Sequence, residues 1–275
     1  MESINPKILD KVLNKKELRG IDREIAIHIL KDNFPTQEYE AAKVKDFNLR
    51  SSQTKECVKA MRRVLRDVHG VFYDAPLSKK DKQQYIEGEK SIKSLLKKHI
   101  STKERYHDYP YLYKQFQEYF GGYTSVADIG CGLNPLSFIN SKVNSVYCTD
   151  ISNDVLFVGE ILNKEGVEVK AEKHNIINVN NREQVLENCQ GRDIVFCLKI
   201  FDSLESLEKD TTRKTLSALM TSMISGIIVS FSLRTVSGKN FIEGNRYWFK
   251  NVLNDLDIEY KIIASKTEKY YLIRT

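Results

Sequence analysis

The chain has 275 residues, more than an average single domain, so it has room for two domains. Its composition is that of an ordinary globular protein, with 41% hydrophobic and 29% charged residues. It lacks an apolar run of bilayer length, a signal peptide and a lipidation motif, so we expect a cytoplasmic protein with no membrane partner. Five cysteines, an odd number without Cys-x-x-Cys spacing, favour reduced thiols and disfavour disulfides and metal sites.

The net charge of +6 is concentrated in the first part of the chain. Residues 1–105 carry 24 Lys and Arg against 16 Asp and Glu, whereas residues 106–275 carry 19 against 21. Such an asymmetry is typical of a surface that binds phosphates, although a solvated helix face has the same composition. Within the basic part, Arg62, Arg63 and Arg66 are our candidates for RNA contact.

The first third of the sequence has the apolar spacing of helices and no strand alternation. Apolar stripes predict helices near residues 8–13, 21–30 and 58–65. A further helix is expected to begin at Thr36, and another to span residues 81–98. We therefore expect an all-helical, basic RNA-binding domain over residues 1–98.

From residue 125 onward, strand and helix patterns alternate. The strand-like runs are residues 125–129, 145–149, 167–173, 193–198, 226–232, 258–264 and 269–273. The helical runs are residues 134–141, 153–165, 181–189, 211–224 and 244–256. This alternation predicts a parallel sheet with helices on both faces, and the short turn between the last two strands predicts a terminal hairpin. We assign residues 99–275 to this α/β domain.

The most informative motif follows the first predicted strand. There Asp128 is followed by Gly130 and Gly132, and the next strand ends at Asp150. Closely spaced glycines let a backbone turn sharply near a ligand, and an acid after the next strand accepts hydrogen bonds from ribose hydroxyls. Pro135 stands where a dinucleotide site needs a third glycine, so S-adenosylmethionine fits better than a nicotinamide or flavin. The alternative is an ordinary glycine-rich turn, which the two strand-ending acids disfavour.

Several segments, in order along the chain, carry a more specific resemblance. They are His99-Ile-Ser-Thr-Lys-Glu-Arg105, Asp128-Ile-Gly-Cys-Gly-Leu-Asn-Pro-Leu136, Thr149-Asp150-Ile151, the segment from Asp193 to Glu205, and the stretch from Val229 to Phe249. Together they resemble the aminoglycoside-resistance 16S rRNA (guanine-N7) methyltransferases. The chain departs from the pattern of that family at several positions. Phe201-Asp202 stands where the family usually has Leu-Pro, Ser232 where it usually has proline, and Asn175 where it has an adenine-contacting acid, and the late loop is a little shorter.

The resemblance implies a class I S-adenosylmethionine-dependent methyltransferase with a Rossmann-like, seven-stranded sheet. It implies action on 16S rRNA in the small ribosomal subunit, at a guanine N7 in the decoding region, with aminoglycoside resistance as the consequence. We expect a monomer. Two other classes stay open, namely a methyltransferase for small molecules or other RNA, and a non-catalytic RNA-binding or ribosome-assembly protein.

The resemblance also implies a role for each candidate cofactor residue. Arg105 suits the carboxylate of S-adenosylmethionine, although Ser101 and Glu104 also form a capping box that would simply begin a helix. Asp128 is expected to fix the loop, and Asp150 to hold the ribose. The adenine contacts are assigned to Asn175, Ile151 and Ile176, although an Asn there is also an ordinary turn residue and the two isoleucines could be core.

The expected chemistry needs no general base, because guanine N7 carries a lone pair and no proton. Catalysis then depends mainly on positioning, so no catalytic residue is assigned, with Lys199 as the one further candidate. The late loop supplies Arg234, Lys239 and Arg246 as RNA contacts. Trp248 and Phe249 could stack on a flipped base, but their helical spacing favours a place in the core.

Overall fold

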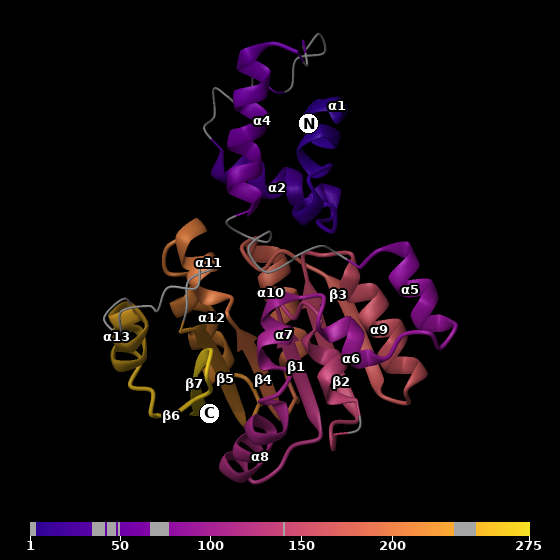
Figure 1. Ribbon diagram of the computed structural model, residues 1–275. Coiled ribbons are helices and arrows are strands. Elements are labelled where there is room, and N and C mark those ends of the chain that lie inside the picture. Colours follow the sequence, from indigo (N-terminus) through magenta and orange to yellow (C-terminus); the bar gives the residue numbers. More distant parts are fainter. Residues whose placement is uncertain are drawn as a thin grey trace.

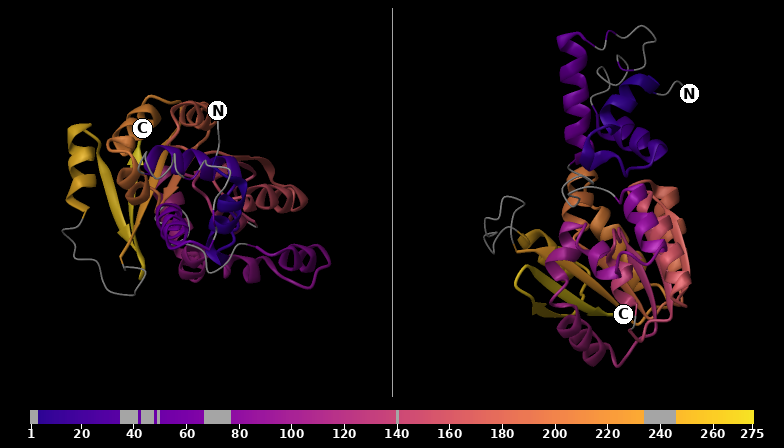
Figure 2. Two further views of the ribbon diagram at one scale, coloured as in Figure 1. Left: turned by 90° about the horizontal axis from the view of Figure 1, so that it is seen from above. Right: turned by 45° about the vertical axis from the view of Figure 1, so that its right-hand side comes forward.

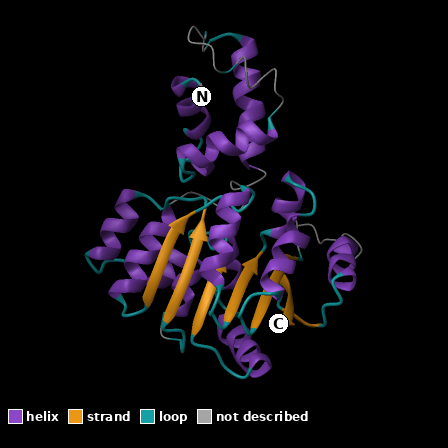
Figure 3. Ribbon diagram, turned by 180° about the vertical axis from the view of Figure 1, so that it is seen from behind, coloured by secondary structure: helices purple, strands orange, loops and turns teal. Residues whose placement is uncertain are grey.

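The computed structural model describes residues 4–34, 42, 48, 50–66, 77–139, 141–233 and 246–275. A group of helices from the first part of the chain stands above a larger α/β body (Figure 1). Two further views show the same arrangement (Figure 2). From behind, the arrowheads of the parallel strands point toward the group of helices (Figure 3). The carboxyl ends of these strands therefore lie on the side of the sheet that faces it.

The α/β body contains one seven-stranded sheet with the order β3-β2-β1-β4-β5-β7-β6. The strands are β1 (Ser125–Ile129), β2 (Ser145–Asp150), β3 (Glu168–Lys173), β4 (Ile194–Leu198), β5 (Gly226–Ser232), β6 (Tyr260–Ala264) and β7 (Glu268–Arg274). β1 to β5 pair in parallel, whereas β7 is antiparallel to both β5 and β6. All seven predicted strands and the terminal hairpin are confirmed. All five residues of β4 are buried, which explains their unbroken apolar run.

Helices pack on both faces of the sheet and give it two hydrophobic cores. Those that follow β1 in the chain are η3 (Asn134–Phe138), α9 (Asp154–Lys164), α10 (Val179–Cys189), α11 (Phe201–Leu207), α12 (Thr211–Met220) and α13 (Tyr247–Asp255). The run predicted at residues 134–141 forms only the short 3-10 helix η3. The short helix α11, directly after β4, was not predicted, and its Phe201 is fully buried against Phe249 of α13.

The upper group of helices consists of α1 (Pro6–Leu13), η1 (Lys16–Leu18), α2 (Arg23–Asn33) and α4 (Ser52–Leu65). Asp22 caps α2 and Ser51 caps α4, each through a side-chain oxygen that accepts backbone N–H groups. The group has its own apolar core, which includes Ile8, Ile29 and Met61. We call residues 4–66 the helical unit. The helix predicted from Thr36 lies outside the described residues.

The helix predicted over residues 81–98 is instead two helices, α5 (Lys79–Ile86) and α6 (Ile92–Leu96). Gly88 has a φ of +78°, a left-handed conformation that ends a helix. α7 (Ile100–Arg105) and α8 (Tyr109–Phe120) follow before the first strand. Leu95 and Leu96 of α6 pack in the core of the sheet, not in that of the helical unit. Thus α5 and α6, which lie before the expected domain boundary at residue 98, belong to the α/β body by their packing.

A short backbone contact joins the helical unit to the loop after β2. Ile21 and Ser152 form an antiparallel bridge, with hydrogen bonds from Asp22 N to Ile151 O (3.1 Å) and from Asn153 N to Gly20 O (2.8 Å). The Lys173 ammonium lies 2.5 Å from the Asp22 carboxylate, and Ile151 packs against the core of the helical unit. The helical unit is therefore joined directly to the residues that follow Asp150.

Within the described ranges, no helix combines the length and the apolar character needed to cross a membrane. No two of the five cysteines, all of which lie in the described ranges, form a disulfide, and four of them are buried. The described part of the chain brings together no group of three or more His, Cys, Asp or Glu side chains that could hold a metal ion.

Candidate functional site

A hollow with about 840 Å³ of empty space, its open mouth included, lies at the carboxyl ends of the parallel strands. This is the place where doubly wound sheets bind ligands. Its walls come from α7, from the loops after β1 to β4 and from α11. The lining residues are His99, Ser101, Arg105, Ile129, Gly130, Cys131, Thr149, Asp150, Ile151, His174, Asn175, Ile176, Ile177, Leu198, Lys199, Ile200, Ser203 and Leu204.

The loop after β1 requires its two glycines. Gly130 and Gly132 have φ values of +66° and +52°, which other residues rarely adopt. A Cβ atom on Gly130 would lie 2.5 Å from the Ile200 side chain, and one on Gly132 would lie 2.8 Å from Nε2 of His99. Gly130 N donates a hydrogen bond to Thr149 O (2.8 Å), which ties the loop to β2. The loop is therefore shaped by close contacts as well as by backbone freedom.

Asp150 lies at the end of β2 and helps to hold the pocket together. Its Oδ2 accepts a hydrogen bond from Gly132 N, and its Oδ1 accepts one from Ser152 N, both at 2.8 Å. Burial raises the pKa of the Asp150 carboxyl to about 6, even though these two backbone bonds favour the ionised form. Asp150, the predicted ribose acceptor, thus also links the glycine loop to the segment after β2, which is bonded to the helical unit.

Asp128, at the end of β1, lies behind the glycine loop. Its Oδ2 accepts a hydrogen bond from Asn134 (2.7 Å), which agrees with the expected role of fixing the loop. Its Oδ1 is buried and has no hydrogen-bond partner in the described part of the chain. Burial raises the pKa of Asp128 to about 7, against the opposing effects of Asn134 and the charge of Arg105. Asn134 in turn accepts hydrogen bonds from Arg105 and from the hydroxyl of Tyr109.

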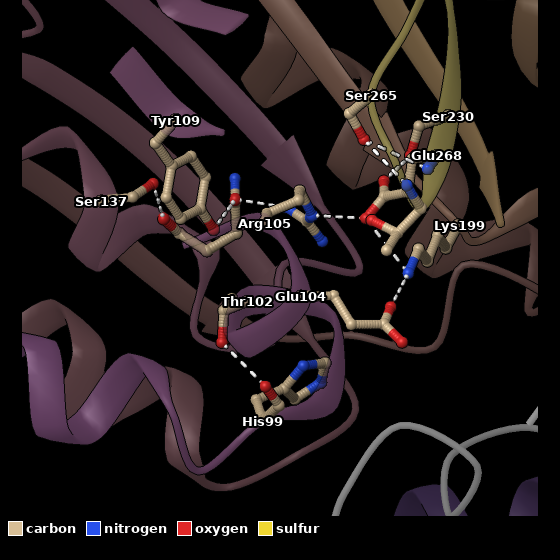
Figure 4. A network of polar contacts seen from close by, with 12 residues as sticks. His99, Thr102, Glu104, Arg105, Tyr109, Ser137, Lys199, Ser230, Ser265 and Glu268 are labelled. Carbon is tan, nitrogen blue, oxygen red and sulfur yellow. Dashed lines mark hydrogen bonds and ion pairs between the residues drawn. The ribbon is translucent and has the colours of Figure 1, made fainter. Parts of the chain in front are cut away.

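A buried network of charges lies beside the pocket (Figure 4). Arg105 Nε donates to Glu268 Oε1 (2.8 Å), and Ser230 Oγ donates to Glu268 Oε2 (2.8 Å). The Lys199 ammonium lies 3.1 Å from Glu268 and 2.8 Å from Glu104. Burial alone would raise the pKa of Glu268, but the positive charges of Arg105 and Lys199 hold that pKa below its usual value. Glu268 therefore stays a carboxylate, and loss of either partner of such a buried pair costs about 3–5 kcal/mol.

Glu268 is the residue of this site that sequence reasoning missed. It lies in the terminal hairpin, 163 positions from Arg105, and no motif surrounds it. A fully buried carboxylate in a strand needs a cation nearby, but the sequence alone does not say which one. The one available signal was the charge of Glu268 next to the apolar run Tyr270–Ile273.

The pocket brings together six of the eight predicted cofactor residues, namely Arg105, Gly130, Asp150, Ile151, Asn175 and Ile176. The other two, Asp128 and Gly132, are hydrogen-bonded to residues of the site as described above. Asn175 is buried, and its side-chain oxygen accepts a hydrogen bond from Ile177 N (3.2 Å), so it also stabilises a turn. Their contacts with a cofactor stay a prediction.

The three predicted RNA-binding arginines of α4 have different surroundings. Arg62 donates hydrogen bonds to the backbone oxygens of Val12 and Lys11, so it joins α4 to α1. Arg63 and Arg66 are exposed and line a surface hollow together with Lys59. We call Lys59 and Arg63 of α4, together with its C-cap residue Arg66, the basic face of α4. Arg66 Nε also lies 3.6 Å from the Glu17 carboxylate, and Arg62 has a structural role.

In the late loop, Arg246 connects Asp202 and Ser232, the two positions where the family usually has proline. Its Nη2 lies 2.7 Å from the Asp202 carboxylate, and its Nη1 donates to Ser232 O (2.8 Å). The guanidinium also lies over the Phe231 ring, 5.0 Å from its centroid. Arg234 and Lys239 lie outside the described residues. Arg246 thus has several partners within the chain, and these give it a structural role besides the predicted RNA contact.

The aromatic residues near this loop are largely core residues, as their helical spacing favoured. Phe231 and Phe249 are buried and pack edge to face, 4.8 Å between ring centroids. Trp248 packs edge to face on Phe231. Tyr247 is the exposed exception, with 64% of its surface accessible.

Comparisons with known proteins agree with this architecture. The model of the family described as "Ribosomal RNA methyltransferase (FmrO)" matches residues 47–247. A 16S rRNA (guanine(1405)-N(7))-methyltransferase from Proteus mirabilis is 27% identical over 225 residues, which cover 77% of this chain and 75% of that protein.

Solved structures share the fold over most of the chain. The 16S rRNA methyltransferase RmtF, in complex with S-adenosyl-L-homocysteine, gives a TM-score of 0.74 at 23% identity and covers 98% of this chain and 97% of its own. The 16S rRNA methylase RmtB gives 0.70 at 22% identity, with 98% and 97% covered. The 16S rRNA methylase ArmA gives 0.57 at 25% identity, with 71% and 96% covered.

The raised pKa of Asp150 predicts a pH-dependent affinity for S-adenosylmethionine. An ionised Asp150 accepts hydrogen bonds from both ribose hydroxyls, so we expect the affinity to rise as the pH rises from about 5 to about 7.5, with release of a proton on binding. Asp150→Asn should bind about tenfold more weakly at the upper pH and lose this dependence. Isothermal titration at several pH values measures both effects.

The affinity for S-adenosylmethionine has to be measured by direct titration, because the folding stability of the free protein changes with pH in the opposite direction. The native state holds more protons on Asp150 than the unfolded chain does, so the free fold loses stability as the pH rises over this range. An unchanged pH dependence in Asp150→Asn would assign it to another group, such as Asp128, and would contradict the prediction.

Proposed function

Because this chain belongs to the ribosomal RNA methyltransferase (FmrO) family, we propose that it methylates N7 of a guanine in 16S rRNA within the small ribosomal subunit. The observation that carries the proposal is the pocket at the carboxyl ends of the strands, with Asp150 in its wall and a basic helical unit joined to the next residues. The name of the Proteus mirabilis relative states the same reaction.

The pocket residues fit S-adenosylmethionine. This cofactor supplies an electrophilic methyl group on a sulfonium sulfur. In our proposal, the Asp150 carboxylate accepts hydrogen bonds from the ribose hydroxyls. The side chains of Ile151 and Ile176 lie against the adenine, with Asn175 near its amine. Nη2 of Arg105 carries no hydrogen bond to another described residue, so it can donate to the carboxylate of the cofactor.

The residues of the chain then act by positioning. Guanine N7 attacks with its own lone pair, so no side chain has to remove a proton. The apolar pocket wall excludes water, and the network around Glu268 holds α7, β4 and β7 in fixed relation beside the reacting groups. N7 faces the deep groove of an RNA helix, so the target base must leave its stack to reach the pocket.

We propose that the helical unit supplies the RNA contacts that hold the subunit during this step. Its core is separate from that of the α/β body, and its exposed basic face lies on α4. The resemblance to the resistance methyltransferases is the basis for expecting aminoglycoside resistance, and a fixed positive charge on the methylated guanine would repel a cationic antibiotic. Action as a monomer and a place in the cytoplasm stay predictions.

Transfer of a labelled methyl group tests the substrate class. Enzyme and S-adenosylmethionine with a labelled methyl group are incubated with purified small subunits, with protein-free 16S rRNA, or with a pool of cell metabolites. We expect label in the subunits, and at least about tenfold less in the free RNA, since binding depends on a folded RNA surface. Asp150→Asn serves as the impaired control. Label confined to the metabolites would replace this proposal with a small-molecule methyltransferase.

Charge reversal on α4 tests the role of the helical unit. Substitution of Lys59, Arg63 and Arg66 by Glu should weaken subunit binding about tenfold or more at about 0.1 M salt and flatten its salt dependence, because phosphate contacts are lost. Affinity for S-adenosylmethionine should not change. Arg62 is left intact because it joins α4 to α1.

The matched control reverses three exposed lysines of the α/β body, namely Lys114, Lys209 and Lys261. Both triple variants change the net charge equally, so nonspecific attraction falls by the same amount. Equal loss of subunit binding in the two variants, or no loss in either, would contradict the prediction that the basic face of α4 binds RNA.

A further inference from the structure

Lys199 occupies a conformation that a lysine rarely adopts. It follows directly after β4 with a φ of +60°, in the left-handed region, and its side chain is 6% exposed in the wall of the pocket. Such a backbone is costly for a residue other than glycine and persists only where the surroundings hold it. Contacts with Glu104 and Glu268 fix the ammonium in place (Figure 4).

The two carboxylates that hold Lys199 differ in their surroundings. Glu268 is fully buried and also receives hydrogen bonds from Arg105 and Ser230. Glu104 comes from α7, has a side chain that is 35% exposed, and uses Oε2 for Lys199 at 2.8 Å. Its Oε1 points away from Lys199 in Figure 4 and has no hydrogen bond to another described residue.

Arg105 and Lys199 share the buried Glu268 carboxylate, so Glu104 balances the second positive charge and still has one carboxylate oxygen available. The Lys199–Glu104 pair places a hydrogen-bond donor and an acceptor side by side, with the donor in the pocket wall and the acceptor on the more exposed side chain of the pair. The ammonium has three protons and two carboxylate partners, which leaves one proton for a ligand.

Guanine presents the complementary pair of groups. Its O6 accepts, lies beside N7 and is followed by the N1–H donor. Adenine has the reverse order, with a donor amine at position 6 and an acceptor at N1. When N7 points toward the cofactor, O6 is the next group that meets the pocket wall, and N1–H lies farther out.

We propose that the Lys199–Glu104 pair recognises the target base as guanine, with Lys199 donating to O6 and Glu104 accepting from N1–H. This inference rests on the proposed function. Adenine would place its amine against the ammonium and its N1 lone pair against the carboxylate, so both contacts would be repulsive.

The substitution Glu104→Gln tests the proposal. Lys199 needs the amide oxygen as its partner, so the amide NH₂ group takes the place of Oε1 and faces the base. It then opposes N1–H of guanine and suits N1 of adenine. We expect methylation of small subunits to fall by roughly ten- to a hundredfold in kcat/KM, with unchanged affinity for S-adenosylmethionine.

The matched control is Glu208→Gln. Glu208 also pairs with a lysine, Lys214, at 2.9 Å, and its side chain is 34% exposed. Each enzyme is assayed on subunits with guanine and on subunits with adenine at the methylated nucleotide. The wild type and the control should both methylate guanine subunits and discriminate against adenine. If these two enzymes transfer no methyl group to subunits, the proposed function fails, independently of Glu104.

With active wild type and control, the two substrates decide the role of Glu104. Loss of guanine methylation in Glu104→Gln, with adenine methylation at or above the wild-type level, supports base recognition. Guanine methylation within about threefold of the wild type would overturn it. A parallel loss on both substrates, or an equal loss of cofactor affinity, would also overturn it and would make Glu104 a structural residue.

Discussion

The buried ion pair between Arg105 and Glu268 joins two parts of the chain that are 163 residues apart. It fixes α7, which follows His99, to β7 of the terminal hairpin. Through Lys199 the same carboxylate holds the end of β4, and through Asn134 the guanidinium reaches the glycine loop. Because an uncompensated charge in this place costs about 3–5 kcal/mol, the fold and the pocket depend on the same contacts.

The second constraint is the short backbone bridge between the helical unit and the loop after β2. Asp22 and Gly20 pair with Ile151 and Asn153, immediately after the Asp150 carboxylate that also holds the glycine loop. A tether at this point places the helical unit on the side of the sheet where the parallel strands end and the pocket lies. The arrangement suits an enzyme that must bind a folded RNA surface and present one base to a cofactor.

Much of this architecture was predictable because it follows local patterns. The central strands are buried, so they read as apolar runs, and Asp150 could be found by its spacing from the glycines. Gly88 did not reveal the break between α5 and α6, because an isolated glycine is also tolerated within a helix. Glu268 and the structural role of Arg62 depend on contacts between distant segments, which one sequence does not encode by spacing. The pairing of Arg246 with Asp202 is of the same kind.

Borohydride–aniline mapping tests the central claim most directly. Methylation of N7 fixes a positive charge on guanine and labilises its glycosidic bond, so reduction followed by aniline cleaves the RNA at that nucleotide. Small subunits treated with enzyme and S-adenosylmethionine should yield one new cleavage at a guanine of 16S rRNA, which is absent without cofactor and in Asp150→Asn. Methyl label in the RNA without any aniline-sensitive guanine would contradict N7 as the acceptor.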